Sequence, residues 1–439
     1  MGSEAYAEVS LADIADFRNG KAIPPEKYTP NGKHPVFGSN GQIACSDEVL
    51  CPDPTIVIGR VGAYCGCVHY VPTASWVTDN AIVASPQKGN DLRYLYYLLG
   101  SLELERTAIG SAQPLMTQKG LKVVQTKVPP LPEQKAIAHI LGSLDDKIEL
   151  NRQMNATLEA MAQALFKSWF VDFDPVIDNA LRAGNPIPDE LAHRAEIRKK
   201  ALADGTANEA TAKEFPAAFK ETEELGWIPE GWEDGKIGDI AKAIGGFAFK
   251  SKAFKEHGYP VIKIKNIVGD GTVSSEGAQC IDTEDANKAL KFALSDGDLL
   301  MAMTGATVGK IGLVVNEDES AYLNQRVAKL VGRNHGDLSP FLFCFFKDQK
   351  NFDSIVSTAE GSAQPNISSS GIESVECPVP PQDTLSLYED TVSSLFEKWI
   401  SNHKKSKTLT KLRDTLLPKL ISRELRITEA EQLTQEALA

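Results

Sequence analysis

One heptapeptide of the chain has residue types suited to binding a nucleotide. Residues 305–311 read "GATVGKI", with a lysine after a glycine, as in the loops that hold the phosphates of ATP. That motif needs four residues between its glycines, where Gly305 and Gly309 are separated by three, and it needs Ser or Thr where this chain has Ile311. A gapped counterpart at Gly62–Gly66 has no lysine. The segment is therefore predicted to be a tight hairpin and not a nucleotide site.

A cluster of four cysteines is the second candidate for chemistry. Cys45, Cys51, Cys65 and Cys67 lie close together in the sequence and have enough sulfur ligands for one zinc ion. Their spacing lacks the usual pairs two residues apart, and the second half of the chain has no matching set. We expect buried free thiols, with zinc as the alternative. The histidines at positions 34, 69 and 139 lack the spacing of a metal site or a catalytic triad.

Signatures of group-transfer enzymes are missing from the sequence. An adenine methyltransferase needs an Asn/Asp-Pro-Pro-aromatic turn for the flipped base and a glycine-rich loop for S-adenosylmethionine. The "NPIP" segment at 185–188 does not replace that turn. We therefore predict no catalytic residue and no metal site in this chain.

The composition predicts a soluble cytoplasmic protein. The chain has 439 residues, of which 42% are hydrophobic and 24% charged, and seven are cysteines, an odd number that does not suit a full disulfide framework. No apolar run approaches the roughly 18 to 20 residues of a membrane span, and "MGSEAYAEVS" lacks the regions of a signal peptide. The net charge of −13 argues against a nucleic-acid coat but leaves local DNA binding open.

The elements that would position any site are duplicated. A shift of 251 residues aligns positions 110–170 with 361–421 without a gap, and 17 of the 61 pairs are identical. "GSAQP" at 110–114 returns at 361–365, and "VPP" at 128–130 returns at 379–381. Two copies indicate a duplicated module and not a solenoid, which needs at least three repeats.

Each copy continues into a segment with the period of a coiled coil. The apolar and amide positions alternate spacings of four and three over more than four heptads. They are Ile137, Leu141, Leu144, Ile148, Asn151, Asn155, Leu158, Ala162, Leu165 and Trp169 in the first copy, and Tyr388, Val392, Leu395, Trp399, Asn402, Ser406, Leu409, Arg413, Leu416 and Leu420 in the second. A helix of this length needs a second helix to cover its seam, and the other copy is the obvious partner.

Polar residues in the middle of both seams predict how the helices pair. If the helices are antiparallel and centred on residues 153 and 404, Asn151 faces Ser406 and Asn155 faces Asn402. Such a buried polar layer fixes register at a cost in stability. A parallel pair would also match Asn151 with Asn402, but the long connection favours the antiparallel arrangement. The alternative is that these are surface amides on ordinary bundle helices.

The segments before each helix are rich in Gly, Pro and short β-branched runs, which predict strands and hairpins. They resemble each other with gaps: "SLADIADF" parallels "KIGDIAKA", "HPVFGSNG" parallels "YPVIKIKN", "IGRVGAYCG" parallels "GATVGKIG" and "VTDNAIVA" parallels "YLNQRVAKL". We predict a first domain (1–130), a first long helix (131–172), a connector that packs along the helices (173–227), a second domain (228–377), a second long helix (378–422) and a polar tail, frayed or awaiting a partner (423–439).

The whole arrangement resembles the specificity subunit of a type I restriction–modification enzyme. The resemblance is most specific at "PPLPEQ" (129–134) and "SWFVDFDPV" (168–176), and it extends to "LGWIPEGWE" and the second "PVPPQ". The second copy departs from the pattern, with "QDTL" at 382–385 in place of "LPEQ". The resemblance implies an α+β fold, with two duplicated mixed α/β target-recognition domains joined by two long helices. The helices would form an antiparallel, pseudo-two-fold symmetric coiled coil.

In function, the resemblance implies a non-catalytic subunit that reads a bipartite, asymmetric site in double-stranded DNA. Its partners would be two methyltransferase (modification) subunits and the restriction/translocase subunits, with no membrane partner. Those partners would use S-adenosylmethionine, ATP and magnesium, and this chain would hold no cofactor. The alternatives are a two-domain coiled-coil scaffold and a stand-alone bivalent DNA-binding protein.

Candidate DNA contacts follow from residue type, because Asn and Gln can pair with an adenine edge, Arg with a guanine edge and Lys with phosphate. Residues 1–130 contain 11 Lys/Arg against 12 Asp/Glu, and residues 228–377 contain 15 against 21, so any basic face is local. "VIKIKN" is predicted to present Lys263 and Lys265 on one strand face. For each amide, a turn that caps its own backbone is the alternative. The candidates are Lys21, Lys33, Ser39, Asn40, Gln42, Arg60, Asn80, Arg93, Ser111, Gln113, Lys250, Lys252, Lys263, Lys265, Asn266, Lys310, Asn324, Gln325, Arg326, Ser362 and Gln364.

Overall fold

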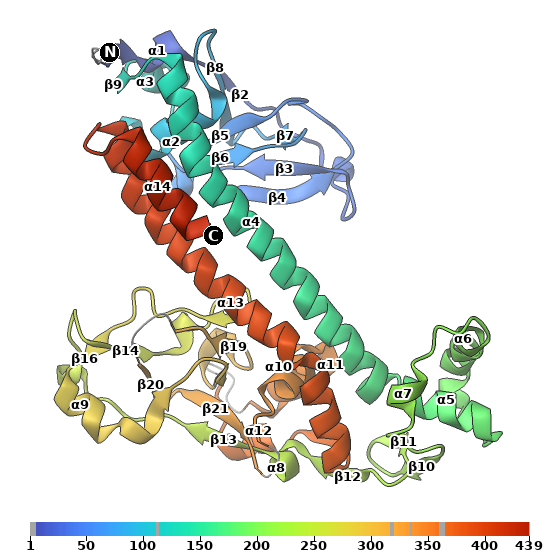
Figure 1. Cartoon of the computed structure of the whole chain (residues 1–439). Helices are drawn as coiled ribbons and strands as arrows, with labels where there is room; N and C mark the ends of the chain where they lie inside the picture. Colours follow the sequence, from blue (N-terminus) through green and yellow to red (C-terminus); the bar gives the residue numbers. More distant parts are fainter. Residues whose placement is uncertain (1–5, 111–113, 317–319, 334–335, 360–364, 439) are drawn as a thin grey trace. The chain divides into compact units, whose positions relative to one another are not determined.

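The structure is a computed structural model that describes residues 6–110, 114–316, 320–333, 336–359 and 365–438 (Figure 1). The chain divides into two compact units, of which the first contains Met1–Leu150 with Lys407–Ala439 and the second contains Asn151–Ser406. None of the helices in the described ranges combines the length and apolar character that a membrane crossing requires.

The globular part of the first unit is built on two small sheets. Its strands are β1 Ala7–Ser10, β2 Ala15–Asn19, β3 His34–Gly38, β4 Gly41–Ser46, β5 Thr55–Gly59, β6 Val68–Val71, β7 Trp76–Val77, β8 Ala81–Pro86 and β9 Gln125–Val128; its short helices are α1 Leu11–Ile14, α2 Leu92–Ser101 and α3 Gln118–Lys122. One sheet has the order β2-β8-β5-β6 and the other β4-β3-β7. The apolar run of β5 is buried on both faces, and α2 packs on this sheet through Tyr94, Leu95 and Leu98.

The globular part of the second unit repeats this plan. Its strands are β12 Glu233–Lys236, β13 Ala241–Gly245, β14 Tyr259–Ile262, β15 Thr272–Val273, β16 Cys280–Ile281, β17 Ala293–Leu294, β18 Leu299–Ala302, β19 Ile311–Val314, β20 Ala321–Leu323, β21 Val327–Gly332 and β22 Glu376–Val379; its helices are α8 Ile237–Ile240, α9 Thr283–Lys288, α10 Ser339–Lys347, α11 Gln349–Thr358 and α12 Ser369–Glu373. The sheets have the orders β13-β21-β18-β19-β15 and β16-β14-β20-β17.

The two domains have matching strand pairings, which confirms the internal duplication. The order β2-β8-β5-β6 corresponds to β13-β21-β18-β19, and β4-β3-β7 corresponds to β16-β14-β20. Each smaller sheet contains one parallel pair at the same place, with Val36 opposite Trp76 in the first domain and Val261 opposite Tyr322 in the second. The second domain adds β15 and β17 at its sheet edges.

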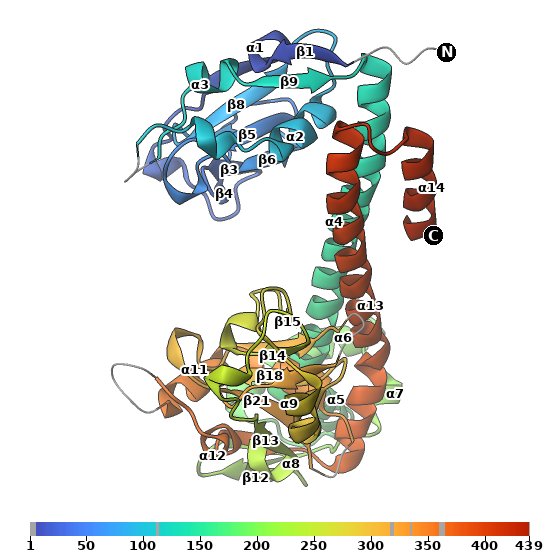
Figure 2. The same cartoon turned by 90° about the vertical axis from the view of Figure 1, so that its left-hand side faces the viewer.

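In each domain, the first strand pairs with the last. β1 and β9 are antiparallel, with Ala7 opposite Val128, and they lie side by side next to the start of the long helix that follows (Figure 2). β12 and β22 form the same pair in the second domain, with Glu233 opposite Val379. The chain therefore enters and leaves each domain at one place.

The two long helices are α4 Leu131–Phe166 and α13 Gln382–Ile421. Within the first unit, Glu133 forms an ion pair with Arg423 just beyond α13 (2.9 Å), and Asp145 pairs with Arg413 (2.6 Å). Residue numbers rise along one helix as they fall along the other, so the pairing is antiparallel, as predicted. The second helix begins four residues later than predicted, directly after Pro380 and Pro381.

The predicted polar layer is present within the second unit. Asn402 Nδ2 donates to Asn155 Oδ1 at 2.9 Å, and Asn151 Nδ2 donates to Ser406 Oγ at 3.2 Å. Asn155 Nδ2 also donates to the Trp399 carbonyl at 3.2 Å. Asn151, Asn155 and Asn402 are 5% exposed or less. The amides are therefore buried and mutually hydrogen-bonded, and the alternative of surface amides is wrong.

Replacing both amides of the central pair is expected to stabilise the helices. The variant Asn155→Leu/Asn402→Leu removes donor and acceptor together, so we expect the free energy of unfolding to rise by about 1 kcal/mol. Register should become less specific because leucine tolerates a slip that an amide does not. Thermal denaturation measures the first effect, and hydrogen exchange of α4 and α13 measures the second.

The matched comparison is Asn155→Leu alone, which leaves the buried Asn402 amide without its acceptor. This single variant should lose about 1–3 kcal/mol. If the double variant is no more stable than the single one, the interpretation of the layer as a specificity device is wrong.

The connector is part of the second unit's core. A π-helical turn at Lys167–Val171 leads from α4 into it, and it contains helices α5 Asp174–Ala183, α6 Ala192–Ala203 and α7 Glu209–Ala212, followed by strands β10 Phe219–Thr222 and β11 Gly226–Pro229. Its buried residues Phe173 and Phe215 share one apolar cluster with Trp232, Phe341 and Phe345 of the second domain. The prediction that it packs along the helices was incomplete, because aromatic residues anchor it to the second domain as well.

Two bidentate ion pairs join α5 to α6. Arg194 donates to both carboxylate oxygens of Asp174 at 2.6 Å, and Arg198 donates in the same bidentate way to Asp178. Both aspartates are buried. Acidic residues four apart on one helix therefore face arginines four apart on the next.

The C-terminal tail is a folded helix. α14 Ile427–Leu438 lies alongside α13 in both views (Figures 1 and 2); Ala430 belongs to the first unit's apolar cluster, and Thr434 is buried as well. The sequence predicts a polar tail that is frayed or awaiting a partner, and the structure differs from this prediction. The segment packs as a helix because the three-to-four spacing of Ile427, Ala430 and Thr434 gives it one buried face.

Candidate nucleic-acid interface

Three loops meet at the same end of the larger sheet in each domain. The first is the turn of a hairpin: Gly62–Tyr64 joins β5 to β6, and Gly305–Thr307 joins β18 to β19. Gly62 (φ 72°) and Gly305 (φ 80°) adopt the left-handed conformation that favours glycine. The prediction that "GATVGKI" is a tight hairpin with a counterpart at Gly62–Gly66 is confirmed.

The second loop follows "GSAQP" and docks onto this turn in both domains. The Pro114 carbonyl accepts a hydrogen bond from the Gly62 amide at 3.1 Å, and the Pro365 carbonyl accepts one from the Gly305 amide at 2.9 Å. Thr117 and Ser368 then begin short helices by accepting from the amides of Gly120 and Gly371, both at 3.0 Å. The duplicated sequence therefore builds the same turn twice. The candidates Ser111, Gln113, Ser362 and Gln364 lie outside the described residues.

The third loop lies before β8 in the first domain and before β21 in the second. The Asn80 carbonyl accepts from the Arg60 amide, and the Arg326 carbonyl accepts from the Met303 amide, both at 3.0 Å. Asn80 and Arg326 thus occupy equivalent positions, as the gapped alignment of "VTDNAIVA" with "YLNQRVAKL" predicts. We call each set of three loops a loop edge.

The first loop edge brings three predicted residues together. The Ser39 hydroxyl donates to the Asn80 carbonyl and accepts from the amides of Arg60 and Val61, both at 3.2 Å. The Arg60 guanidinium donates to the Asp79 carbonyl at 3.0 Å. Ser39 therefore holds the loops together, whereas the neighbouring Asn40 and Gln42 are exposed.

The second loop edge has two cavities, and Gln325 and Arg326 line both. One, of about 450 Å³, also includes Thr304, Asn366 and Ser368, and the other, of about 300 Å³, includes Phe249, Phe254 and Lys263. Gln325 and Arg326 are exposed, whereas Asn324 is buried and accepts from the Arg326 amide at 3.4 Å. Gln325 and Arg326 are therefore the side chains of this edge best placed to meet a ligand.

The prediction for "VIKIKN" is wrong. β14 ends at Ile262, and Ile264–Asn266 form a 3-10 turn, so Lys263 and Lys265 do not share a strand face. Lys263 Nζ lies 3.6 Å from the Phe254 ring centroid and donates to Gln279 at 2.6 Å; burial, and then the charge of Lys265, lowers its pKa. Lys265 donates to the Gly277 carbonyl at 2.8 Å.

Two further candidates have structural partners. The buried Asn266 side chain accepts from the Lys263 amide at 3.0 Å and donates to the Ser274 carbonyl at 2.9 Å, so it caps its own turn. Arg93 pairs with Asp146 of α4 at 2.7 Å. Neither has the free side chain that base recognition needs.

The remaining lysine candidates are scattered. Lys21, Lys33, Lys250 and Lys252 are exposed, and Lys310 is half-buried just before β19. Lys250 and Lys252 flank Ser251, which lines the smaller cavity, so they lie near the second loop edge. Lys33 lies at the start of β3, where its amide donates to Asp47 at 3.2 Å, and Lys21 follows β2.

Sequence reasoning missed the apolar character of the first loop edge. Tyr64 at the hairpin tip is 47% exposed, and Ile109 and Leu115, which pair with each other beside it, are 66% and 36% exposed. Leu115 is the counterpart of Asn366 at the second edge under the shift of 251 residues. The shift of 251 residues was the signal in the sequence that could have identified Leu115 and Asn366 as equivalent positions.

The cysteines are not alike. Cys51 and Cys65 are buried, Cys45 is half-buried and Cys67 is exposed, so the expectation of buried thiols is wrong for Cys67. Arg18 donates to the Cys51 sulfur at 3.1 Å, and burial raises the pKa of the Cys51 thiol. Among the described residues, no group of three or more His, Cys, Asp or Glu side chains could hold a metal ion.

Comparison with known proteins follows the duplication. The family described as "Type I restriction modification DNA specificity domain" matches residues 3–160 and again residues 229–417. The chain is 28% identical over 335 residues to the type I restriction enzyme HindI specificity subunit of Haemophilus influenzae, covering 71% of each protein. It is also 28% identical over 356 residues to the MjaIX specificity subunit of Methanocaldococcus jannaschii, covering 78% of this chain and 71% of that protein.

A solved structure supports the fold. The S subunit of the type I restriction–modification system from M. genitalium matches with a TM-score of 0.58 and 18% identity, over 96% of this chain and 97% of that chain. At this identity the likeness concerns the fold alone. It confirms the predicted class of two duplicated mixed domains with long paired helices.

Proposed function

Because this chain belongs to the type I restriction–modification DNA specificity family, we propose that its two loop edges each read one half of a bipartite, asymmetric DNA site. Its sequence lacks the adenine-methyltransferase turn, and "GATVGKI" departs from the phosphate-binding loop of a translocase. We propose that two methyltransferase subunits and the restriction subunits supply that chemistry, using S-adenosylmethionine, ATP and magnesium.

The observation that carries this proposal is one backbone frame with two sets of side chains. Both edges have the same hairpin turn, the same proline carbonyl contact and the same third loop. The first edge presents Tyr64, Leu115 and Asn80, whereas the second presents Asn366, Gln325 and Arg326 at or beside the corresponding places. A shared frame supports docking on DNA in one way, and different side chains support reading two different sequences.

Each edge suits a different mode of base readout. Arg326 and Gln325 supply the bidentate donors and acceptors that pair with guanine and adenine edges. Tyr64, Ile109 and Leu115 supply apolar surface of the kind that contacts a thymine methyl group. We therefore expect the half-site read by the first domain to contain A·T pairs where apolar contact discriminates.

Methylation mapping of a host genome that carries the complete system tests the proposal. A single split motif, with methylated adenines in two different half-sites, is the expected result. Methylation at a single continuous motif would contradict the two-edge arrangement.

Substitution of Arg326 gives a finer test. Arg326→Ala should weaken binding of the cognate duplex by about 1–3 kcal/mol, roughly five- to 150-fold, and should relax specificity at one position of one half-site. Selection from a randomised duplex library by the assembled methyltransferase measures both effects. The control is Arg333→Ala, which removes a cation of the same domain that pairs with Glu373 at 3.5 Å. An equal loss of affinity for all duplex sequences would indicate that Arg326 contacts phosphate groups and not a base edge.

A further inference from the structure

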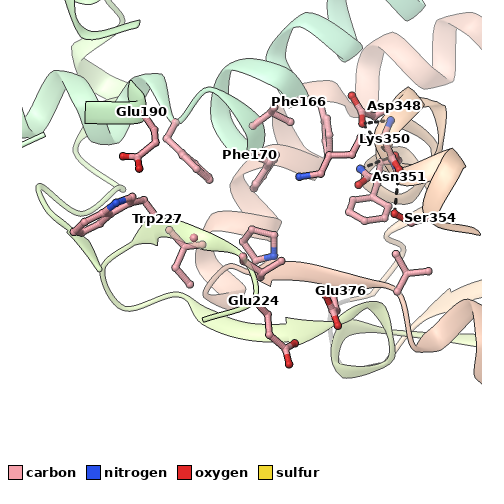
Figure 3. Close-up of a pocket in the computed structure, with 18 of the residues that line it drawn as sticks. Phe166, Phe170, Glu190, Glu224, Trp227, Asp348, Lys350, Asn351, Ser354 and Glu376 are labelled. Carbon is pink, nitrogen blue, oxygen red and sulfur yellow. Dashed lines mark hydrogen bonds between the residues drawn. The ribbon is translucent and has the colours of Figure 1, made fainter. Parts of the chain in front are cut away.

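A cavity of about 690 Å³ opens in the second unit (Figure 3), and none of its lining residues belongs to a loop edge. The π-helical turn, the β10–β11 hairpin, helix α11 and strand β22 contribute to its walls. Its volume lies within the range of sites that bind ligands or inserted side chains. The family match leaves out residues 161–228, so much of this wall belongs to the connector.

The inner wall of this cavity is aromatic. Phe166 and Phe170 reach it from the end of α4, and Phe341 and Phe345 from α10. Phe170 and Phe341 pack edge to face, with centroids 5.0 Å apart at an interplanar angle of 90°, whereas Phe341 and Phe345 are stacked. Because the rings belong to the unit's main buried cluster, the wall is rigid. Trp227 stands at the opposite side, next to Glu190 (Figure 3).

The rim of the cavity is acidic. Five carboxylate side chains line it against one described cation, Lys350; they are Glu190, Glu221, Glu224, Asp348 and Glu376. The four glutamates are exposed, whereas Asp348 is used to begin α11, accepting from the amides of Lys350 and Asn351 at 3.1 and 3.3 Å. Glu224 lies against Glu376, whose charge, followed by that of Asp234, raises the pKa of Glu224.

This combination of charge and aromatic surface selects a class of ligand. The carboxylates repel the phosphates of DNA, so the cavity is not an extension of the DNA site. A guanidinium group matches it in two ways, because it stacks on aromatic faces and forms bidentate hydrogen bonds with carboxylates. The aliphatic part of an arginine, or a neighbouring apolar side chain, can cover the phenylalanine wall.

We propose that this cavity is a docking site for an arginine-bearing segment of a partner polypeptide of the restriction–modification complex. The proposal rests on the proposed function only in taking that partner to be a subunit of the same complex. The connector occurs once per chain, whereas the domain and helix occur twice. The site therefore serves one partner copy, and it distinguishes the two ends of an otherwise duplicated subunit.

A fluorescence anisotropy experiment on the full chain tests the chemistry of the cavity. The probe is a labelled heptapeptide that alternates arginine and leucine, and the control peptide alternates glutamate and leucine. We expect the arginine peptide to bind, and Glu224→Gln/Glu376→Gln to weaken its binding at least tenfold. The matched control is Glu223→Gln/Glu230→Gln, which removes two exposed glutamates of the same region that do not line the cavity.

Several outcomes would overturn the proposal. Equal binding by the two double variants, or equal binding of both peptides, would show that no specific site exists. Spermidine that competes with the peptide at equal concentration would show a site for small polycations instead. Both double variants should unfold at or above the wild-type temperature, because each removes exposed like charges, so lost binding cannot be attributed to unfolding.

A second measurement separates this proposal from the proposed function. Glu224→Gln/Glu376→Gln should leave duplex binding by the chain unchanged, while it lowers the fraction of chains that retain the full number of partner subunits on native mass spectrometry of the co-expressed complex. Arg326→Ala should do the reverse. If the chain binds the arginine peptide but shows no DNA selectivity, only the proposed function is contradicted. If the chain selects DNA, and both Glu224→Gln/Glu376→Gln and Arg326→Ala assemble fully, only the docking site is contradicted.

Discussion

Replacing Arg198 with methionine is expected to lower the free energy of unfolding by about 3–5 kcal/mol. Arg198 Nε donates to Asp178 Oδ1 at 2.8 Å, and the Asp178 side chain is 2% exposed. Methionine preserves most of the apolar volume but leaves the carboxylate buried without its bidentate donor. Chemical denaturation of the full chain measures the change, and limited proteolysis should locate it in the connector.

The control for this prediction is Arg182→Met. Arg182 pairs with the exposed Glu209 at 3.4 Å, and exposed pairs contribute about 0.2–1 kcal/mol or nothing measurable. The double variant Asp178→Leu/Arg198→Met should recover most of the stability because it removes the buried charge together with its partner. If Arg198→Met lowers the free energy of unfolding by no more than Arg182→Met does, the ion pair between Arg198 and Asp178 does not stabilise the fold.

Glu389→Gln is expected to remove most of a decline in stability toward alkaline pH. Burial raises the pKa of the Glu389 carboxyl, which is half-buried by area, to about 8, helped by the nearby Asp337 and Asp390 and opposed by the hydrogen bond from the Phe341 amide (3.0 Å). The folded chain therefore keeps a proton that the unfolded chain releases near its ordinary pKa of 4.5. Stability should be greatest below about pH 4.5 for this group and fall as pH rises to about 8.

The amide of the variant resembles the protonated carboxyl at every pH. At pH 8.5 the variant should be more stable than the wild type by on the order of 2–4 kcal/mol, and near pH 5 the two should be similar. Urea denaturation between pH 5 and 9 checks both values. Asp383→Asn, an exposed carboxyl at the start of the same helix, should leave the pH profile unchanged. Parallel profiles for wild type and Glu389→Gln would refute the assignment.

The long helices could be predicted in detail because their pattern is local and repeated. The heptad spacing gave the seam, and the amides at 151, 155 and 402 gave a register that the hydrogen bond between Asn155 and Asn402 confirms. The shift of 251 residues was equally informative. It placed Pro114 with Pro365 and Gly120 with Gly371, and each pair has the same role in both domains.

Other features depend on contacts between residues far apart in the sequence. Nothing local shows that β3 pairs in parallel with β7, or that the connector's Phe173 packs edge to face on Trp232 of the second domain. The strand at "VIKIKN" was misjudged because the amide of Asn266 turns the chain after Ile262, which alternating lysines do not reveal. The arginines and aspartates of the connector, by contrast, had readable spacings of four, which were overlooked.

The candidate site shows the same division. Residue types identified Asn80, Gln325 and Arg326, which lie on the loop edges, but could not reveal that Ser39 is used to hold the loops or that Arg93 pairs with Asp146. Hydrogen-bonding capacity can be read from a sequence. Whether the fold has already used that capacity cannot.

The pairing of first strand with last in each domain has a consequence for how such a protein changes. Ala7 lies opposite Val128, and Glu233 lies opposite Val379, so the chain enters and leaves each domain at two adjacent backbone points. A genetic exchange with both crossover points in those strands would transplant a whole recognition surface while leaving the helix register, the buried amides and the connector intact. A new DNA specificity can therefore be acquired in one recombination event, without a series of mutations that each have to keep the old site working.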